Sequence, residues 1–314
     1  MIIFRLLPVI IIIKLFGRAY ALLHHSFSPS SSLTLMQSFD FSSAAEWDKF
    51  YKTPVKPSNS SIASEAATPF ARKTTTIVTE WHSTVPLDEI ASVVPSNAKC
   101  LIIGCGNSNL PDRILQQQGQ RSPPKSLVLF DSSQTCLDQL RNRFQNVDNE
   151  CNQSNEFTTK ITTDIEYICG DATKLTEYFS TNHAVIQDGK LVQDKARKRR
   201  NEGESLFDII IDKGLTDAIL CGEGWDGPLE KLLHESANML STDTGRYLLI
   251  SYQLPSSTKN FLMTVGEKIG LEWEFDVDLA ELSVTQLSRL SDENEYRQAS
   301  VAVARKTSNY QALT

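Results

Sequence analysis

Residues 101–119 read LIIGCGNSNLPDRILQQQG, and this stretch is the most informative about the fold. An apolar run leads into two glycines one residue apart, Gly104 and Gly106, and a helix-like pattern follows them. A strand, a glycine turn and a helix in this order are typical of the first unit of a nucleotide-binding α/β sheet. A dinucleotide-binding turn would place a third glycine at position 109, where this chain has Asn109. The stretch therefore predicts a nucleotide site and leaves the kind of nucleotide open.

The composition is that of a large α/β domain with an acidic balance of charge. The chain has 314 residues, of which 40% are hydrophobic and 22% charged, enough for a substantial core. Its net charge of −7 argues against a general electrostatic attraction for nucleic acid, so a nucleic-acid partner is not expected. The six cysteines form no CxxC and no paired Cys/His spacing, which favours a reducing compartment and predicts no metal site.

Residues 1–39 differ from the rest of the chain in charge. They contain basic but no acidic residues, and the first acid is Asp40. The apolar run at 6–13 is too short to span a bilayer, so we expect no stable membrane span in the mature chain. The basic, Ser-rich composition predicts a targeting presequence over 1–39 and favours a mitochondrion or plastid as the destination. The secretory pathway or the cytoplasm is the alternative.

Two further segments follow this start. Residues 40–96 are predicted as an N-terminal arm and linker, with an aromatic helix at 45–51 and a Ser/Pro-rich stretch after it. Residues 97–307 are predicted as the main domain, with an insertion at 181–205. The insertion contains the basic run KARKRR at 195–200, which indicates either a contact for RNA or an acidic protein, or a solvated loop.

The main domain alternates apolar runs with helical patterns. Near-continuous apolar runs are typical of strands buried in parallel sheets, and two further β patterns near the end of the chain have no predicted helix between them. This alternation predicts an α/β fold: a doubly wound, seven-stranded sheet that is mostly parallel, with an antiparallel pair at its edge. The predicted strands are 100–104, 126–130, 165–169, 207–211, 245–252, 271–277 and 299–305, and the helices between them include 111–118, 133–145 and 228–240.

Polar residues follow four of the predicted strands, where ligands of open α/β sheets bind. Glycines let the backbone approach a ligand closely, a carboxylate after the second strand can accept ribose hydroxyls, and an acid after the third can accept from an adenine amine. Each feature alone is weak, because an acid at a strand end often only caps a helix, as Asp171 could. Their agreement in order is what points to a nucleotide; in chain order they are GCGNS at 104–108, Asp131, Asp171–Ala172 and Asp212–Lys213.

Four stretches in this order, LIIGCGNSNL, LVLFDSS, YICGDATKL and FDIIIDKGLTDAIL, resemble successive motifs of class I S-adenosylmethionine-dependent methyltransferases. GCGNS together with DKGLTDA is similar to the methyltransferase-like group that modifies lysines of translation elongation factor 1A or of mitochondrial citrate synthase. EWDKFY at 46–51 and TEWHS at 79–83 match the upstream aromatic motifs of that group. The resemblance covers roughly residues 45–305 and implies S-adenosylmethionine as the cofactor and a protein substrate of the elongation factor or citrate synthase type.

The resemblance also implies roles for individual residues. Four would line the methionine part of the cofactor, two would lie at its ribose, two at its adenine, and two would face the methyl group as the catalytic pair. The sequence departs from the group where Leu215–Thr216 replaces its usual Thr-Leu, which is on the acceptor side. In the order of these roles, the residues are Gly104, Gly106, Asn107 and Ser108; Asp131 and Ser132; Asp171 and Ala172; and Asp212 and Lys213.

Several interpretations stay open at this point. Asp212 is predicted to orient an acceptor amine, with bonding of the neighbouring turn amides as the alternative. Trp47, Tyr51 and Trp81 either line the acceptor entrance or pack the arm onto the sheet. The isolated His82 lacks the partner spacing of a metal ligand. The alternative functions are a small-molecule methyltransferase and a non-catalytic binding module with the same fold.

Overall fold

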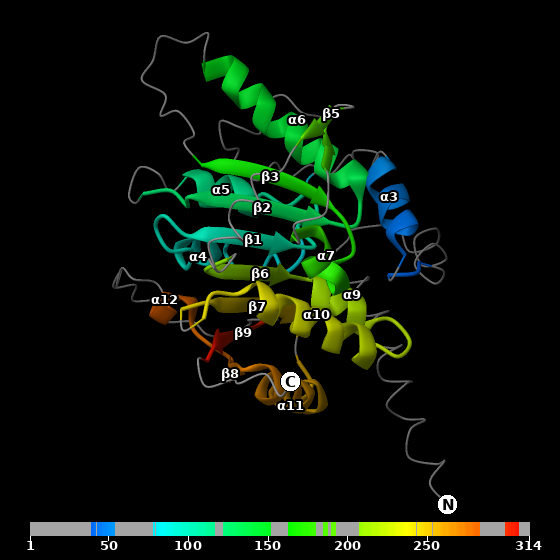
Figure 1. Cartoon of the computed structure of the whole chain (residues 1–314), viewed down its shortest axis with the longest axis vertical. Coiled ribbons are helices and arrows are strands. Elements are labelled where there is room, and N and C mark those ends of the chain that lie inside the picture. The colour runs from blue at the N-terminus through cyan, green and yellow to red at the C-terminus, as the bar shows by residue number, and fades with distance from the viewer. Residues whose placement is uncertain are drawn as a thin grey trace, which may run out of the picture.

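The computed structural model describes a subset of the 314 residues. The described residues are 39–41, 43–53, 78, 80–116, 122–151, 163–179, 185–187, 190–192, 207–242, 244–252, 254–282 and 299–307. Their elements, shown in Figure 1, are α3 (Ala44–Lys52), α4 (Leu87–Ser92), β1 (Lys99–Ile103), α5 (Leu110–Gln116), β2 (Ser126–Asp131), α6 (Gln134–Cys151), β3 (Asp164–Cys169), the 3-10 helix η3 (Ala172–Lys174), α7 (Leu175–Phe179), β4 (Val185–Gln187), β5 (Lys190–Val192), β6 (Ile209–Lys213), α9 (Leu215–Leu220), α10 (Asp226–Met239), β7 (Arg246–Tyr252), α11 (Ser256–Ile269), β8 (Leu271–Phe275), α12 (Leu279–Leu282) and β9 (Ala299–Lys306).

Seven of the strands form one sheet in the order β3-β2-β1-β6-β7-β9-β8. β3, β2, β1, β6 and β7 run parallel, and β9 runs antiparallel to both of its neighbours. All seven predicted strands are present within two residues of their expected bounds, and the predicted doubly wound fold is confirmed. The chain moves outward from β1 to β3 and then returns to place β6 on the other side of β1. The strand order therefore switches between β1 and β6, the position at which open α/β sheets bind ligands.

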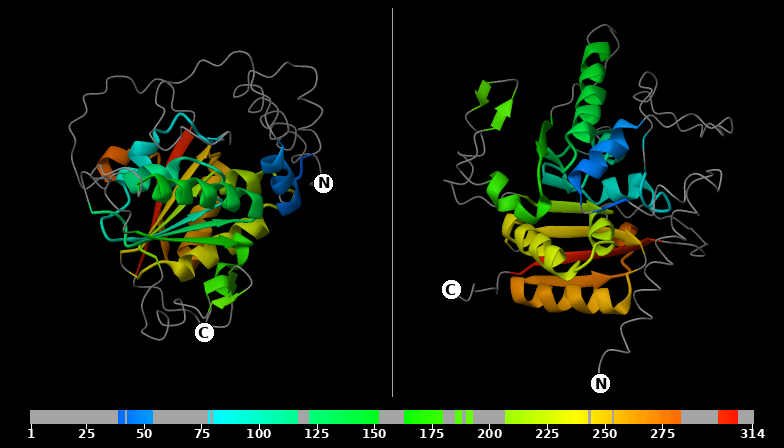
Figure 2. Two further views of the ribbon diagram at one scale, coloured as in Figure 1. Left: turned by 90° about the horizontal axis from the view of Figure 1, so that it is seen from above. Right: turned by 90° about the vertical axis from the view of Figure 1, so that its right-hand side faces the viewer.

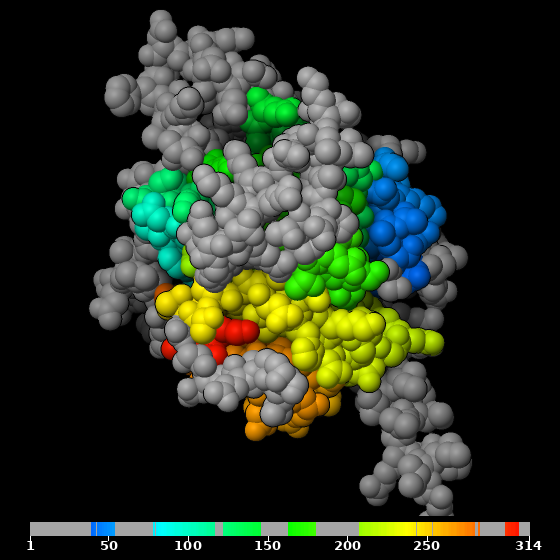
Figure 3. Space-filling view, in the orientation of Figure 1, coloured from blue at the N-terminus to red at the C-terminus, as the bar shows by residue number. Residues whose placement is uncertain are grey.

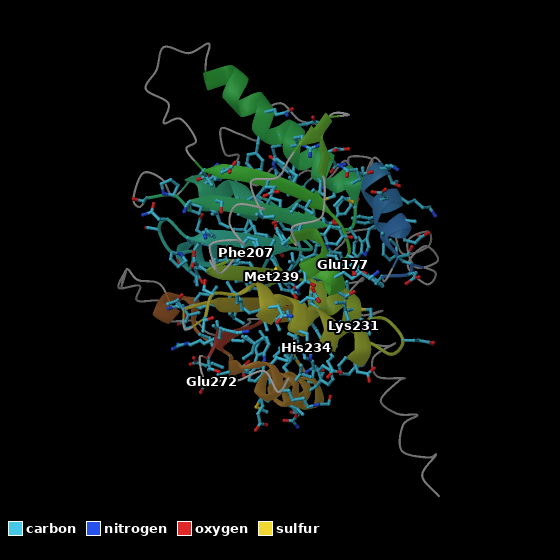
Figure 4. All side chains as sticks on the ribbon, in the orientation of Figure 1. Glu177, Phe207, Lys231, His234, Met239 and Glu272 are labelled. Atoms are coloured by element: carbon cyan, nitrogen blue, oxygen red, sulfur yellow. The ribbon has the colours of Figure 1, made fainter. Side chains whose placement is uncertain are left out.

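Alternation along the strands builds a separate hydrophobic core on each face of the sheet. In β1, Cys100 and Ile102 pack into one core, and Leu101 and Ile103 pack into the other. Helices α4, α5 and α6 cover the first face, and α7, α10 and α11 cover the second (Figure 2). The start of β6 is tied to this second layer, since the amide of Phe207 donates to the carbonyl of Met239 at 3.0 Å. Figure 4 shows these two labelled residues close together beside β6.

One difference from the expected architecture is that residues of the predicted arm pack into the first core. Val85, Ile90 and Val94 are buried in the first core together with residues of β1 and β2, and α4 packs on α5. A second difference is a helix near the end of the chain, where the sequence predicted none between the last two strands. Leu279 begins α12 and is fully buried, so this short helix closes the first core.

Some predicted segments lie outside the described residues. These are 1–38 of the presequence, most of the Ser/Pro linker at 54–77, and the basic run at 195–200. Within the insertion the structure describes a short antiparallel hairpin of β4 and β5. Among the helices that the structure describes, none combines the length and the apolar character needed to cross a membrane.

Candidate active site

The predicted site residues meet at one edge of the sheet. The last pairs of the central strands are in register, with Ile103 of β1 beside Phe130 of β2 on one side and Asp212 of β6 on the other. Since these strands are parallel, the loops that follow them emerge together. Helix α3 lies beyond this edge in Figure 1 and forms part of the outer surface on the same flank in Figure 3. The arm therefore lies against the strand-end loops.

The glycine turn after β1 requires both of its glycines. Gly104 and Gly106 have φ angles of +59° and +54°, a region that other residues rarely adopt. A Cβ on Gly104 would lie 2.8 Å from the Cβ of Leu215, and one on Gly106 would lie 2.9 Å from the hydroxyl of Tyr51. The turn is thus closely approached by α9 on one side and by the arm on the other.

Asp131 joins the ends of β1 and β2. Its Oδ2 accepts from the amide of Gly106 and its Oδ1 from the amide of Ser133, both at 2.9 Å. Burial raises the pKa of Asp131, while these two hydrogen bonds oppose the rise. A carboxylate can accept more than two hydrogen bonds, so Asp131 can also accept from hydroxyls of a ligand. The neighbouring Ser132 is exposed and its carbonyl accepts from the thiol of Cys169 at 3.5 Å.

Asp171 is exposed and caps η3. Its Oδ1 accepts from the amide and the hydroxyl of Thr173, at 2.9 and 2.8 Å. Ala172 is the first residue of η3 and is half-buried. This is the capping contact that the structural alternative predicts. The adenine role of Asp171 and Ala172 stays a prediction.

Asn107 and Ser108 are both buried, and residues that sequence reasoning missed hold them in place. The Ser108 hydroxyl donates to Oε2 of Glu80 at 2.8 Å, and the Asn109 amide donates to Oε1 of Glu80 at 2.5 Å. From α6, the Arg143 guanidinium donates to the carbonyls of Ser108 and Asn107 at 2.6 and 3.2 Å. The TEWHS motif was the available signal for Glu80. Nothing in the local pattern singled out Arg143.

Asp212 makes the contacts of the alternative role that the sequence analysis left open. This residue is fully buried, and its carboxylate accepts from the amides of Leu215 and Thr216, the hydroxyl of Thr216 at 2.6 Å and the hydroxyl of Tyr247 at 2.8 Å. Burial raises the pKa of Asp212 to about 6, although the bonds from Thr216 and Tyr247 oppose the rise. A carboxylate enclosed in this way presents no surface to an incoming amine. Asp212 is therefore an anchor for the start of α9, as the structural alternative predicts.

Lys213 follows Asp212 and is also buried, but it reaches the arm. Its Nζ lies 2.9 Å from Oε2 of Glu80, and the Lys213 and Glu80 side chains are 5% and 21% exposed. The same Glu80 oxygen accepts from Ser108. The loop predicted to hold the donor and the end of β6 are therefore joined through one carboxylate of the arm.

The arm is fastened to the strand-end loops at two further points. Oδ1 of Asp48 accepts from the Ser133 hydroxyl at 2.5 Å, and Nε2 of His82 lies 2.6 Å from Oδ2 of Asp217. His82 is thus hydrogen-bonded to Asp217 and belongs to no metal-ligand group among the described residues.

The aromatic residues of the arm pack on one another. Trp47 stacks on Tyr51 and meets Trp81 edge to face, with ring centroids 6.2 and 6.0 Å apart. Trp47, Tyr51 and Trp81 are all half-buried. The packing interpretation is what the structure describes, and the role at the acceptor entrance stays a prediction.

In the described part of the chain, one group of side chains has the spacing of a metal site. The ligand atoms of Cys105, Asp131 and Cys136 all lie within 4.8 Å of one another. The hydrogen bond from Cys105 and burial raise the pKa of the Cys136 thiol, and burial raises that of Cys105. Neutral thiols are poor metal ligands, and three ligands fall short of the four of a structural zinc site. His234, labelled in Figure 4, is exposed on α10 and is not a member of this group.

No family model matches the sequence, and no curated protein sequence matches it either. Solved structures with a similar fold include a TehB-like SAM-dependent methyltransferase from Corynebacterium glutamicum, which is 17% identical, with a TM-score of 0.40 over 70% of this chain and 86% of that one. Precorrin-6y C5,15-methyltransferase from Geobacter metallireducens is 10% identical, with a TM-score of 0.40 over 73% and 94% of the two chains.

A third similar structure is TYW2 from M. jannaschii in complex with AdoMet. It is 12% identical, with a TM-score of 0.35 over 69% of this chain and 72% of that one. At such identities the activities of these three proteins are not carried over to this chain.

Proposed function

We propose that this chain is an S-adenosylmethionine-dependent methyltransferase that methylates a lysine of a protein substrate. The contact between Asp131 and Gly106 carries the donor part of this proposal. It joins the glycine turn after β1 to the carboxylate after β2 at 2.9 Å, at the point where the strand order switches. A glycine turn suits the amino-acid tail of the donor, and the carboxylate of Asp131 suits its ribose hydroxyls.

The acceptor part of the proposal is supported by two motifs of the resemblance that contact each other. TEWHS supplies Glu80 and His82, and DKGLTDA supplies their partners Lys213 and Asp217. These pairs close the edge of the site beside the glycine turn. The proposed substrate is a protein of the elongation factor or citrate synthase type.

When bound, S-adenosylmethionine supplies an activated methyl group on its sulfonium. Transfer is an in-line displacement, so the main work of this chain is to align the acceptor with the donor. A lysine amine with a solution pKa of ~10.4 has to lose its proton before it reacts. A partly desolvated entrance lined by the half-buried rings of Trp47 and Trp81 favours the neutral amine.

The donor is tested by thermal unfolding of the full chain. We expect S-adenosylhomocysteine to raise the unfolding midpoint and NAD to leave it unchanged, because the turn lacks the third glycine of a dinucleotide site. Stabilisation by NAD alone would contradict the proposed donor.

The acceptor is tested with methyl-labelled S-adenosylmethionine and fractionated extracts of the source cell. We expect the label in a protein, on a lysine that mass spectrometry of the labelled band identifies. Label found only in small molecules would replace the protein substrate with the small-molecule alternative. Donor binding without transfer to any fraction would favour the binding module.

A further inference from the structure

Glu80 makes the contacts of the arm that reach both sides of the candidate site. Its Oε1 accepts from the Asn109 amide at 2.5 Å, and its Oε2 accepts from the Ser108 hydroxyl at 2.8 Å. The same Oε2 lies 2.9 Å from Nζ of Lys213. Ser108 and Asn109 belong to the loop after β1, and Lys213 is the last residue of β6. One carboxylate therefore spans the switch point of the sheet.

Glu80 and Lys213 form an ion pair in which the lysine is the more deeply buried partner. The Lys213 side chain is 5% exposed, and that of Glu80 is 21% exposed. A buried ammonium is strongly disfavoured unless a carboxylate pairs with it, so the position of Lys213 depends on that of Glu80. Because Glu80 also holds Ser108, a shift of the carboxylate would move both loops.

The arm has other attachments besides Glu80. Asp48 is bonded to Ser133 at 2.5 Å, and His82 is bonded to Asp217 at 2.6 Å. The second of these anchors lies only two residues from Glu80. The arm therefore remains fastened on either side when the Glu80 carboxylate is removed, and its removal breaks the bonds to the two loops of the site.

We propose that Glu80 is a positioning residue for methyl transfer, and this inference rests on the proposed function. Glu80 fixes the relation between the loop that receives the donor and the end of β6 on the acceptor side. An in-line displacement is sensitive to this relation, since a misplacement of about 1 Å can slow such a reaction by about a hundredfold. Glu80 can take this role because its carboxylate is partly exposed and contacts both loops of the site. The enclosed carboxylate of Asp212 instead anchors the start of α9.

The test compares Glu80→Gln, Glu80→Asp and the double variant Glu80→Gln/Lys213→Met in the full chain. Three quantities are measured: the thermal unfolding midpoint, the affinity for S-adenosylhomocysteine by calorimetry, and the single-turnover rate of transfer to the protein fraction that the wild-type chain labels. Glu46→Gln is the matched control, because Glu46 lies on the same arm in a surface pair with Lys49.

We expect Glu80→Gln to lower the single-turnover rate by about a hundredfold while donor affinity stays within about tenfold. Glu80→Asp should recover part of the rate, and Glu46→Gln should match the wild type. The double variant removes the unpaired ammonium, so it should recover the unfolding midpoint without recovering the rate. This split between stability and rate is the signature of positioning.

Two outcomes would overturn the inference alone: a Glu80→Gln chain that transfers at the wild-type rate, or a double variant in which rate and stability recover together. The second would show that Glu80 only neutralises Lys213. A wild-type chain that neither binds S-adenosylhomocysteine nor labels any protein would overturn the proposed function and this inference together.

Discussion

Asp131 and Asp212 follow or end strands on opposite sides of β1, and both are buried carboxylates whose pKa is raised by burial. They differ in what surrounds them. Asp131 accepts from the amides of Gly106 and Ser133, and the residue keeps 7% of its surface exposed. Asp212 accepts from two amides and two hydroxyls and keeps none. The same position in a strand-end pattern therefore gives two buried acids. Asp131, the open acid, has fewer donors and a slight exposure, and Asp212, the closed acid, is fully enclosed.

The largest expected effect follows removal of the open carboxylate. Asp131→Ala should weaken S-adenosylhomocysteine binding by about a hundredfold or more, or about 3 kcal/mol, because hydrogen bonds to a charged acceptor contribute about 1.5–3 kcal/mol each. Calorimetry on the full chain measures this change. Asp138→Ala on the exposed surface of α6 serves as the control. A variant that is folded and still binds within a few-fold of the wild type would show that Asp131 only fastens the glycine turn.

The closed carboxylate should affect stability more than donor affinity. Asp212→Asn replaces one accepting oxygen with an NH₂ group that faces the donors of Thr216 and Tyr247. We expect the free energy of unfolding to fall by about 2 kcal/mol, because a buried donor is left unsatisfied. Donor affinity should stay within about tenfold of the wild type. Denaturant unfolding measures the first quantity and calorimetry the second, and a loss of affinity without a loss of stability would return Asp212 to the binding site.

These two acids also show which features of the structure can be predicted from the sequence and which cannot. The seven strands were predictable because near-continuous apolar runs such as 126–130 are typical of strands that are buried in a parallel sheet. The place of each strand-end acid was predictable for the same reason, since parallel strands bring their carboxyl ends together. The direction of the Asp212 carboxylate was not, because it depends on hydroxyls of Thr216 and Tyr247 that only the fold brings to it.

The contacts of the arm could not be predicted from local sequence patterns, because they join residues that are far apart in the chain. Glu80 bonds Ser108 across 28 residues and Lys213 across 133. The polar stretch 54–77 precedes Glu80, so no periodicity continues from α3 to it. Val85 and Ile90 belong to the apolar residues of 85–94, and only the sheet shows that they join its core.

The smallest expected effect is a dependence of stability on pH that belongs to the closed acid. The pKa of Asp212 is raised to about 6 by burial, against an ordinary value of 3.8. A carboxyl whose pKa is higher in the folded state contributes stability that is fully present below its unfolded pKa and is lost as the pH rises through its folded pKa. The window for this group therefore runs from about pH 4 to pH 6.

Between pH 7 and pH 5, we expect the wild-type free energy of unfolding to gain about 1 kcal/mol relative to Asp212→Asn, in which the titrating group is absent. The burial-raised pKa of Asp112, also about 6, cancels in this difference because both chains carry it. Denaturant unfolding of both chains at several pH values in this range measures the difference. A difference that stays constant with pH would mean that the four donors around Asp212 keep its carboxylate ionised throughout this range.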